Sequence, residues 1–386
     1  MSHYAYGTSH PPHTVMKIRI LTTYAVYNYG ASLQAYALTA YLAGKGHDAT
    51  LINYQPAYLT RKYDYRWVNP ESPLSRYALT RALYRVMKYV QRQTTLRRKR
   101  AFDRFTQALL PQTPHRYTTC DELRQQPPEA DLYLAGSDQI WNVFYDAGRD
   151  PAFYLQFGRP GVRKASYAAS FSYLDIDAPT LSRIGQALRE FTAISVREWQ
   201  GADLVSRMGL QATWVLDPVF LLPAAAWQRL MNLPRPQERY LLVYDFERNA
   251  ALKHFAQAYA RRHGLHIYSI NDTYPLPYAH HNYNGAGPQE FLSLLYHSQA
   301  FVSNSFHGTA FSILFHKPVF VFPRHRHKVN SRMESLLHLF QMDDCIIHTP
   351  AQAEAALTRP FDFEATERIL TRERQKSENF IATLLS

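Results

Sequence analysis

The sequence predicts an α/β protein in which two Rossmann-like domains face each other across a cleft, with a helical insertion in the first. Short apolar runs alternate with longer amphipathic segments, which is typical of parallel strands joined by helices. The alternation forms two series, and Pro223, Pro234 and Pro236 lie between them. The expected organisation is a tail at 1–15, an N-terminal domain at 16–222 with the insertion at 57–115, a linker at 223–238, a C-terminal domain at 239–360 and a terminal helix at 361–386.

The N-terminal domain begins with a strand, a helix and a second strand. The run "MKIRILTTY" (16–24) predicts a buried strand, and "DATLINYQP" (48–56) predicts its neighbour. Between them, "YNYGASLQAYAL" (27–38) predicts a loop at Gly30 and then a helix that closes near Gly44. This βαβ unit indicates the start of an open parallel sheet.

The insertion interrupts this pattern. Residues 77–110 have a helical period, with aromatic and aliphatic side chains on one face and Arg or Lys on much of the other. Either the helices expose a solvated basic face, or they lie on anionic lipid headgroups. Nucleic-acid binding is disfavoured, because no recognition motif accompanies the charge.

Further strands complete both domains. Those of the first are predicted in "ADLYLAGSDQIWN" (130–142), "KASYAASF" (164–171), "TAISVRE" (192–198) and "ATWVLDPVFLL" (212–222). Those of the second are predicted in "RYLLVYDF" (239–246), "HIYSI" (266–270), "AFVSN" (300–304) and "PVFVF" (318–322), with helices between them.

Polar or glycine residues follow four of these strands. They lie at 27–32, 135–142, 195–198 and 303–308. Ligands of open parallel sheets bind beyond the carboxyl ends of the strands, so these corners point to one shared cleft. The candidate cleft-lining residues are Asn28, Tyr29, Gly30, Asp138 and Gln139. Helix capping is the alternative role for Asp138.

The corner "SNSFHG" (303–308) combines an ionisable ring with a glycine. We expect Gly308 to allow a tight turn, and the helix that follows offers free N–H groups and a positive dipole end to an anion. His307 can then donate a proton to that anion. The alternative is a structural histidine that caps the helix or is held by hydrogen bonds.

A basic run follows at 323–332, with Arg324, Arg326, Lys328 and Arg332. Arg332 falls near the first turn of a predicted helix, where the dipole disfavours a cation, so it needs an anion from the protein or from a ligand. A solvated loop of mixed charge is the alternative. A metal at His325 and His327 is disfavoured, because no carboxylate or cysteine completes a ligand set.

Composition narrows the class of protein. The net charge is +12 and the pI is about 9.5, which favours anionic partners. The two cysteines, Cys120 and Cys345, form no disulfide framework and suit a reducing compartment. There is no apolar run of membrane-spanning length and no signal-peptide pattern in 1–15. We expect a cytoplasmic protein, with the inner face of the cytoplasmic membrane as a further possible location.

Taken together, the motifs resemble the polysaccharide pyruvyl transferase family. The resemblance covers about Met16 to Phe340. It rests on the order and spacing of "YNYGASLQAYAL" (27–38), "GSDQIWN" (136–142), "KASYAASF" (164–171), "ISVRE" (194–198), "VLDPVFLL" (215–222), "GPQEFLSLL" (287–295) and "SNSFHGTAFSILF" (303–315).

The resemblance implies a GT-B-like fold, phosphoenolpyruvate as donor, and a pyruvyl ketal on two hydroxyls of a sugar as product. It implies His307 as general acid and Arg197, Lys328 and Arg332 as donor-binding cations, although a local ion pair with Glu198 is the alternative for Arg197. Ser305 and Gly308 complete the donor set, and Ser305 stands where many relatives have arginine. No metal or other cofactor is expected, because guanidinium and ammonium groups can neutralise the donor.

The resemblance also implies a glycan acceptor, either lipid-linked or a polysaccharide precursor. The basic helices at 74–110 would hold the enzyme near anionic headgroups, and no nucleic-acid partner is expected. The main alternative is a GT-B glycosyltransferase that uses a nucleotide sugar, with Glu290 placed to hold the ribose. A non-catalytic binding protein is a further alternative, motivated by Ser305.

Overall fold

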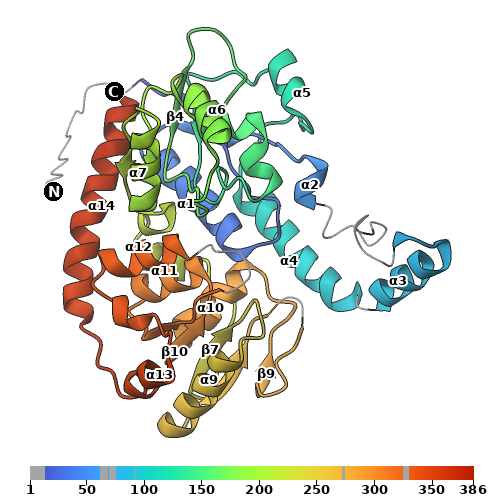
Figure 1. Cartoon of the computed structure of the whole chain (residues 1–386), viewed down its shortest axis with the longest axis vertical. Helices are drawn as coiled ribbons and strands as arrows, with labels where there is room; N and C mark the ends of the chain where they lie inside the picture. The colour runs from blue at the N-terminus through green and yellow to red at the C-terminus, as the bar shows by residue number, and fades with distance from the viewer. Residues whose placement is uncertain (1–13, 61–67, 69–74, 91, 272–273, 325–329) are drawn as a thin grey trace, which may run out of the picture.

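Each half of the chain builds one parallel sheet (Figure 1). The computed structural model describes residues 14–60, 68, 75–90, 92–271, 274–324 and 330–386. The first sheet has the order β2-β1-β3-β4, formed by β1 (Lys17–Leu21), β2 (Asp48–Leu51), β3 (Leu132–Ala135) and β4 (Arg163–Ser166). The second has the order β11-β10-β7-β8-β9, formed by β7 (Tyr240–Tyr244), β8 (His266–Ser269), β9 (His281–Asn282), β10 (Ala300–Ser303) and β11 (Val319–Val321).

A third, two-stranded sheet continues the first domain. It pairs β5 (Ser195–Val196) with β6 (Thr213–Trp214), and a bridge between Ala169 and Val196 places it beyond β4. A pocket lined by residues of both halves lies between the two larger sheets. The predicted fold class, two Rossmann-like domains facing across a cleft as in GT-B proteins, is confirmed.

Helices cover the sheets and form the contact between the two halves (Figure 1). The central strands of the second sheet are buried on both faces, as is typical of parallel sheets, and every residue of β7 and β10 is buried. The helices are α1 (Tyr29–Gly44), α2 (Ala57–Thr60), α3 (Ala78–Val90), α4 (Arg92–Leu109), α5 (Cys120–Gln125), α6 (Ala178–Leu188), α7 (Trp199–Arg207), α8 (Ala224–Gln228), α9 (Ala250–His263), α10 (Pro288–His297), α11 (Phe306–Leu314), α12 (Ser331–Leu339), α13 (Pro350–Ala356) and α14 (Phe363–Leu385).

The insertion is only partly the exposed helical pair that the sequence predicts. Helix α3 lies at the far end of α4, away from both sheets (Figure 1). The second half of α4 joins the core instead, where Phe102 and Phe105 are buried. Arg98 is buried with them, because its guanidinium lies 4.3 Å from the centre of the Tyr29 ring and donates to the carbonyl of Ala286 at 3.2 Å. The basic side of α4 is therefore partly an internal packing surface.

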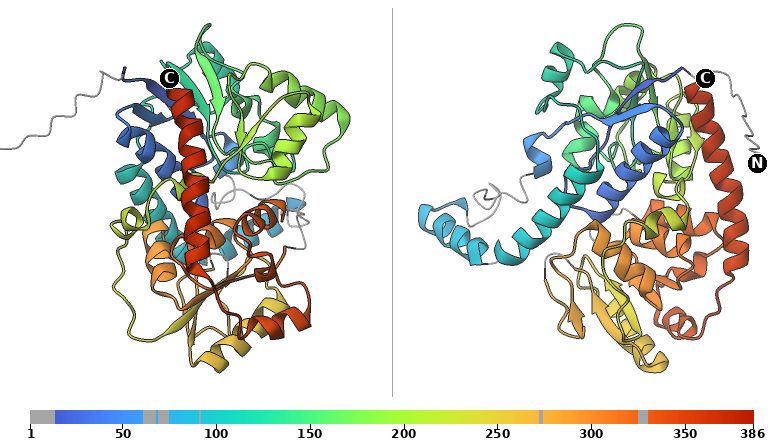
Figure 2. Two further views of the ribbon diagram at one scale, coloured as in Figure 1. Left: turned by 90° about the vertical axis from the view of Figure 1, so that its left-hand side faces the viewer. Right: turned by 180° about the vertical axis from the view of Figure 1, so that it is seen from behind.

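The C-terminal helix α14 runs along one side of the molecule from the second domain back to the first (Figure 2). Ser377 accepts a hydrogen bond from the Leu216 amide at 2.9 Å, and the Arg374 side chain donates to the Phe220 carbonyl at 2.6 Å. The segment after Phe220 includes α8, whose Trp227 is fully buried against Phe311 of the second domain. Within the described ranges, no helix combines the length and apolarity needed to cross a bilayer.

Candidate active site

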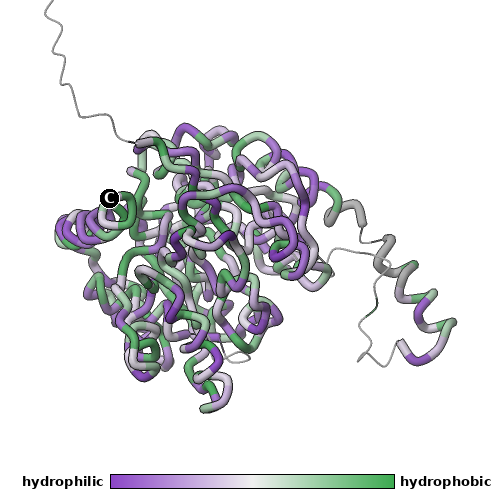
Figure 3. The backbone as a smooth tube through the Cα atoms, turned by 90° about the horizontal axis from the view of Figure 1, so that it is seen from above, coloured by the Kyte–Doolittle hydropathy of each residue, from purple (hydrophilic) through white to green (hydrophobic). Residues whose placement is uncertain are grey.

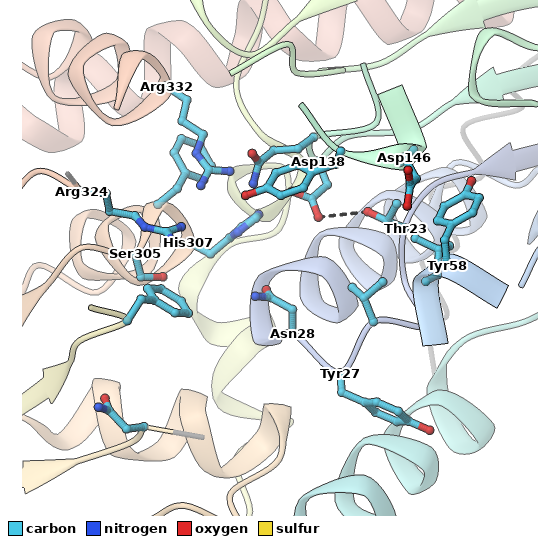
Figure 4. A pocket seen from close by; sticks show the side chains of 18 of the residues that line it. Thr23, Tyr27, Asn28, Tyr58, Asp138, Asp146, Ser305, His307, Arg324 and Arg332 are labelled. Carbon is cyan, nitrogen blue, oxygen red and sulfur yellow. Dashed lines mark hydrogen bonds between the residues drawn. The ribbon is translucent and has the colours of Figure 1, made fainter. Parts of the chain in front are cut away.

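A pocket of about 540 Å³ lies between the two domains, at the carboxyl ends of their strands (Figure 4). This volume suits a small ligand together with part of a second one. Two sides of the pocket carry polar groups, and most of them lie on three of the four corners that the sequence predicts, at 27–32, 135–142 and 303–308, or in the predicted basic run. The C-terminal domain contributes Ser305, His307, Arg324 and Arg332, and the N-terminal domain contributes Thr23, Asn28, Asp138 and Gln139.

Two helices begin at this pocket, one from each domain. Asn28 caps α1 by accepting from the Ala31 amide at 3.2 Å, and Ser305 caps α11 by accepting from the Gly308 amide at 3.3 Å. Both cap residues line the pocket, and the two helices are in contact. The positive ends of two helix dipoles therefore meet there, an arrangement that favours an anion.

The ring of His307 lies directly against the first turn of α1. A Cβ added to Gly30 would lie 1.8 Å from Nδ1 and 2.2 Å from Cγ of His307. Only a glycine at position 30 leaves room for the ring. The sequence predicts Gly30 in a loop, whereas it is the second residue of helix α1, so its role is to admit His307 and not to turn the chain.

The other ring nitrogen of His307 faces a buried charge pair. Its Nε2 lies 3.5 Å from Asp217 Oδ2 and 3.5 Å from Arg197 Nη1. Arg197 donates to the same Asp217 oxygen at 2.8 Å, and Ser137 donates to it at 2.9 Å. Burial alone would raise the pKa of Asp217, but His307 and Arg197 hold it well below its usual range.

Arg197 is enclosed by carboxylates and does not line the pocket. Besides Asp217, its guanidinium lies 3.3 Å from Asp138 and 4.0 Å from Glu198, and its side chain has no exposed area. The ion pair with Glu198 that the sequence offered as an alternative is thus present, though it is the longest of the three. Arg197 also stacks over the Phe306 ring at 4.4 Å. It lies behind His307, as part of the frame that holds the ring.

The two flanking carboxylates have opposite pKa shifts. Burial opposes the charge of Asp138, but Arg197 and His307 outweigh it and lower its pKa. Burial dominates at Glu198 and raises its pKa, although one carboxylate oxygen accepts from Ser170 and from the amides of Phe171 and Ser172. Asp138 has a positive φ of 74°, and Thr23 donates to its side chain at 3.1 Å, so it does not cap a helix.

Arg332 brings a buried cation to the pocket. It is the second residue of α12, as the sequence predicts, and it is 6% exposed. Its Nε has no hydrogen-bond partner, and no carboxylate in the described part of the chain lies within ion-pair distance of it, although Asp138 is near enough to attract its charge. Burial and then repulsion from Arg197 lower its pKa to about 10. The Gln139 amide oxygen, when turned toward Arg332, lies 2.5 Å from Nη1.

Arg324 is a second cation at the pocket, and its environment differs. Its Nε donates to Glu247 at 3.1 Å, and its guanidinium lies over the Phe246 ring. The charge of Arg324 is therefore largely balanced by the protein. Lys328 lies outside the described residues.

Three expectations about these residues need correction. Gly308 makes no tight turn, since it is inside α11, and a Cβ there would lie 2.4 Å from the Phe301 ring, so close packing requires the glycine. Tyr29 does not line the pocket, because it is buried between the domains, stacked on Phe291 at 4.7 Å. Glu290 caps its own helix by accepting from the Gly287 amide and holds Asn232, so it does not face the pocket.

Asp217 is the residue of this site that sequence reasoning missed. It appears there only as the end of a strand, in "VLDPVFLL", although an aspartate at such a corner is itself a signal. Arg324 belongs to the predicted basic run, although the resemblance assigns it no role. Among the residues that the structure describes, no group of three or more His, Cys, Asp or Glu is placed to hold a metal ion.

Solved structures with a similar course of the chain are distant in sequence. They include an S. aureus MnaA–UDP complex (10% identity, 91% of this chain and 90% of that chain, TM-score 0.49). They also include a Neisseria meningitidis UDP-GlcNAc 2-epimerase bound to UDP-GlcNAc (10% identity, 92% and 98%, TM-score 0.45) and the spinosyn forosaminyltransferase SpnP (11% identity, 96% and 99%, TM-score 0.45). No curated protein matches the sequence.

A family model matches most of the chain. It is that of the polysaccharide pyruvyl transferases, and the match runs over residues 28–326. It therefore includes Asn28, Gly30, Asp138, Asp217 and His307, the residues that the structure brings together around one imidazole. The chain belongs to the polysaccharide pyruvyl transferase family.

Proposed function

We propose that this protein transfers the pyruvyl group of phosphoenolpyruvate to two hydroxyls of a glycan, forming a ketal and releasing phosphate. The observation that carries the proposal is Arg332, a buried guanidinium without a carboxylate partner in the described chain, at a pocket that also holds His307. A buried unpaired charge is costly unless a ligand completes it. Phosphoenolpyruvate has a phosphate and a carboxylate to offer.

The donor would be held by groups from both domains. Arg332 and the N-terminus of α11 would bind one anionic group of the donor. The N-terminus of α1 would face the donor's negative charge from the opposite side of the pocket. Arg324 would add a second, partly balanced cation. Many relatives have an arginine at the position of Ser305. The Ser305 hydroxyl is uncharged and caps α11, so Arg332 would supply the positive charge instead.

His307 would act as the general acid. It gives a proton to the methylene carbon of the donor, and positive charge forms at the neighbouring carbon. One sugar hydroxyl attacks this carbon and loses its proton. The bond from this carbon to the phosphate oxygen then breaks, phosphate leaves with the electron pair, and the second hydroxyl attacks and loses its proton. One released proton restores His307, and the other leaves on hydrogen phosphate.

Asp217 and Arg197 would act as positioning residues in this reaction. The Asp217 carboxylate lies 3.5 Å from Nε2 and stabilises positive charge on the ring, while Arg197 fixes that carboxylate. Arg197 would therefore act through Asp217 and not by touching the donor, unlike the role that the resemblance implies for it.

The test is incubation of the purified protein with phosphoenolpyruvate and a panel of glycans, followed by phosphate assay and mass spectrometry. We expect a product heavier by one pyruvate less one water, and no product from His307→Ala, with unchanged circular dichroism. His316→Ala is the control, because His316 is a partly exposed histidine just beyond the C-terminal end of α11. Product from His307→Ala at the wild-type rate would refute the acid role. Turnover of nucleotide sugars alone would favour a glycosyltransferase.

A further inference from the structure

We propose that helix α3 and the residues that lead into it dock on an anionic lipid bilayer and hold the active site next to a lipid-linked glycan. Docking on the bilayer does not depend on the proposed function. The choice of a lipid-linked glycan as the acceptor rests on the proposed function. The sequence predicts membrane contact broadly over residues 74–110, and the structure narrows it to one helix. The arm is defined here as residues 75–97, apart from position 91, which lies outside the described residues.

The arm exposes large apolar side chains on one face. Leu79 is 80% exposed, and Leu83 and Val86 are each 60% exposed, at a spacing of four and three residues that aligns them along the helix. Tyr77, just before the helix, is 69% exposed. Half of the eight large hydrophobic residues exposed in the described chain thus lie on this short segment. A patch of this kind marks an interaction surface.

The charge of the segment selects an anionic partner. From Ser75 to Phe102 the sequence has nine Lys or Arg residues and no Asp or Glu. Arg98 is buried and Lys99 pairs with Asp103, so the arm itself provides most of the remaining charge. An apolar face beside basic side chains, with tyrosine next to it, is the composition of a helix that lies in the headgroup region of a bilayer.

The arm projects from the body in Figure 1, in the right-hand view of Figure 2 and in Figure 3. Its position leaves the apolar face of α3 free of the two domains, so the patch does not serve the protein's own core. A bilayer could meet this helix without meeting the rest of the molecule first.

The C-terminal end of the arm is fixed at the pocket wall. On the C-terminal side, Arg98 of α4 donates to the carbonyl of Tyr27, and Tyr27, which lines the pocket, donates to Asp103 of α4 at 3.0 Å. A bilayer that holds the arm therefore also sets the position of the active site relative to the membrane.

The structure also changes which residues can be used to test membrane binding. Neutralising Arg98 would remove its contacts with Tyr29 and Ala286, so a loss of binding would be indistinguishable from a loss of packing. Leu79 and Leu83 are exposed, and their replacement by serine leaves the core intact. Val15 and Trp199, which are 63% and 48% exposed on the body, provide a matched pair of exposed apolar residues.

The experiment is flotation of the full chain with vesicles of phosphatidylglycerol and phosphatidylcholine, or of phosphatidylcholine alone. We expect binding only to the anionic vesicles, weakened by salt, and reduced about tenfold in Leu79→Ser/Leu83→Ser. Val15→Ser/Trp199→Ser should bind as the wild type does. Equal binding by the arm variant, or equal binding to both vesicle types, overturns the proposal.

Two further measurements test self-association of the arm and the choice of acceptor. If light scattering shows a wild-type oligomer that the arm variant dissociates, and no vesicle binding occurs, the face is a self-association surface and the proposal fails. In a turnover assay, the arm variant should keep its rate on a water-soluble glycan and lose rate on a vesicle-embedded one. Vesicle binding without any turnover of phosphoenolpyruvate would refute the proposed function and leave the docking helix standing.

Discussion

The imidazole of His307 occupies the space that a side chain at Gly30 would fill. The two residues belong to helices of different domains, and a Cβ at position 30 would lie 1.8 Å from His307 Nδ1. The first turn of α1 is thus one wall of the place where the ring lies. This contact ties the orientation of the proposed acid to the closure of the two domains.

Gly30→Ala should therefore remove activity and keep the fold. The ring must move aside by more than an ångström, and a displacement of that size costs roughly 100-fold in kcat. Alanine favours a helix over glycine by about 1 kcal/mol, which offsets the contact, so the free energy of unfolding should change little. Steady-state kinetics and urea denaturation measure the two effects.

The matched control is Gly44→Ala at the other end of the same helix. A Cβ there meets nothing within 4 Å, so both activity and stability should be retained. Wild-type kcat in Gly30→Ala would show that the position of the ring does not matter for the reaction.

Gly308→Ala should lower stability, in contrast to Gly30→Ala, which should lower activity. Its Cβ would lie 2.4 Å from the ring of Phe301, which is fully buried in β10 and has little room to shift. Overpacking of this kind costs about 1–3 kcal/mol, which urea denaturation should show as a lower midpoint with an unchanged slope. Unchanged stability would mean that β10 and α11 can separate more easily than their packing indicates.

The strands and the corners of this fold were readable from the sequence, because short apolar runs such as "RYLLVYDF" have few other uses than a buried parallel strand. The Asn28, Asp138, Ser305 and His307 corners do meet at one pocket. Sequence order therefore located the site to within a few residues at three of the four predicted corners, while the fourth, at 195–198, lies behind the pocket lining.

The contacts that hold the site together could not be read in the same way. The packing of Gly30 on His307 and the pairing of Asp217 with Arg197 depend on how distant helices and strands meet. The helical period of α4 predicted a basic outer face, but Arg98 points inward because Tyr29 and the Ala286 carbonyl compensate its charge. Periodicity predicts that a charged side chain points outward only when no neighbouring group compensates the free-energy cost of burying it.

Acid should destabilise this protein partly through Asp217. Its pKa is lowered in the folded state, so its contribution to stability is complete above the unfolded value of about 3.9 and is lost as the pH falls toward the lower folded value. Asp217→Asn should cost roughly 3 kcal/mol at pH 7, because Arg197 loses a buried partner. Urea denaturation from pH 7 to pH 3 should then show a shallower fall below pH 4 than in the wild type.

Glu198→Gln provides a control of opposite sign. The pKa of Glu198 is raised in the folded state, so its contribution declines as the pH rises from about 4.3 toward the folded value. Glu198→Gln should therefore make stability decline less as the pH rises above about 4.3, and it should leave the loss of stability at lower pH unchanged. Parallel pH curves for wild type and Asp217→Asn would contradict the assignment of the low pKa to Asp217.

Arg332→Met should separate donor binding from stability more clearly than any other substitution in the pocket. The guanidinium is buried with an unpartnered Nε, so its replacement by an apolar side chain of similar length should leave the free energy of unfolding equal or higher. The loss of a charge-assisted contact to the donor should raise the KM for phosphoenolpyruvate roughly 10- to 100-fold. The thermal shift that inorganic phosphate produces should also be smaller than in the wild type.

Arg324→Met is the contrast, since it removes an ion-pair partner of Glu247 and should lower stability. A destabilised Arg332→Met with an unchanged KM would mean that the protein, and not a ligand, completes this charge.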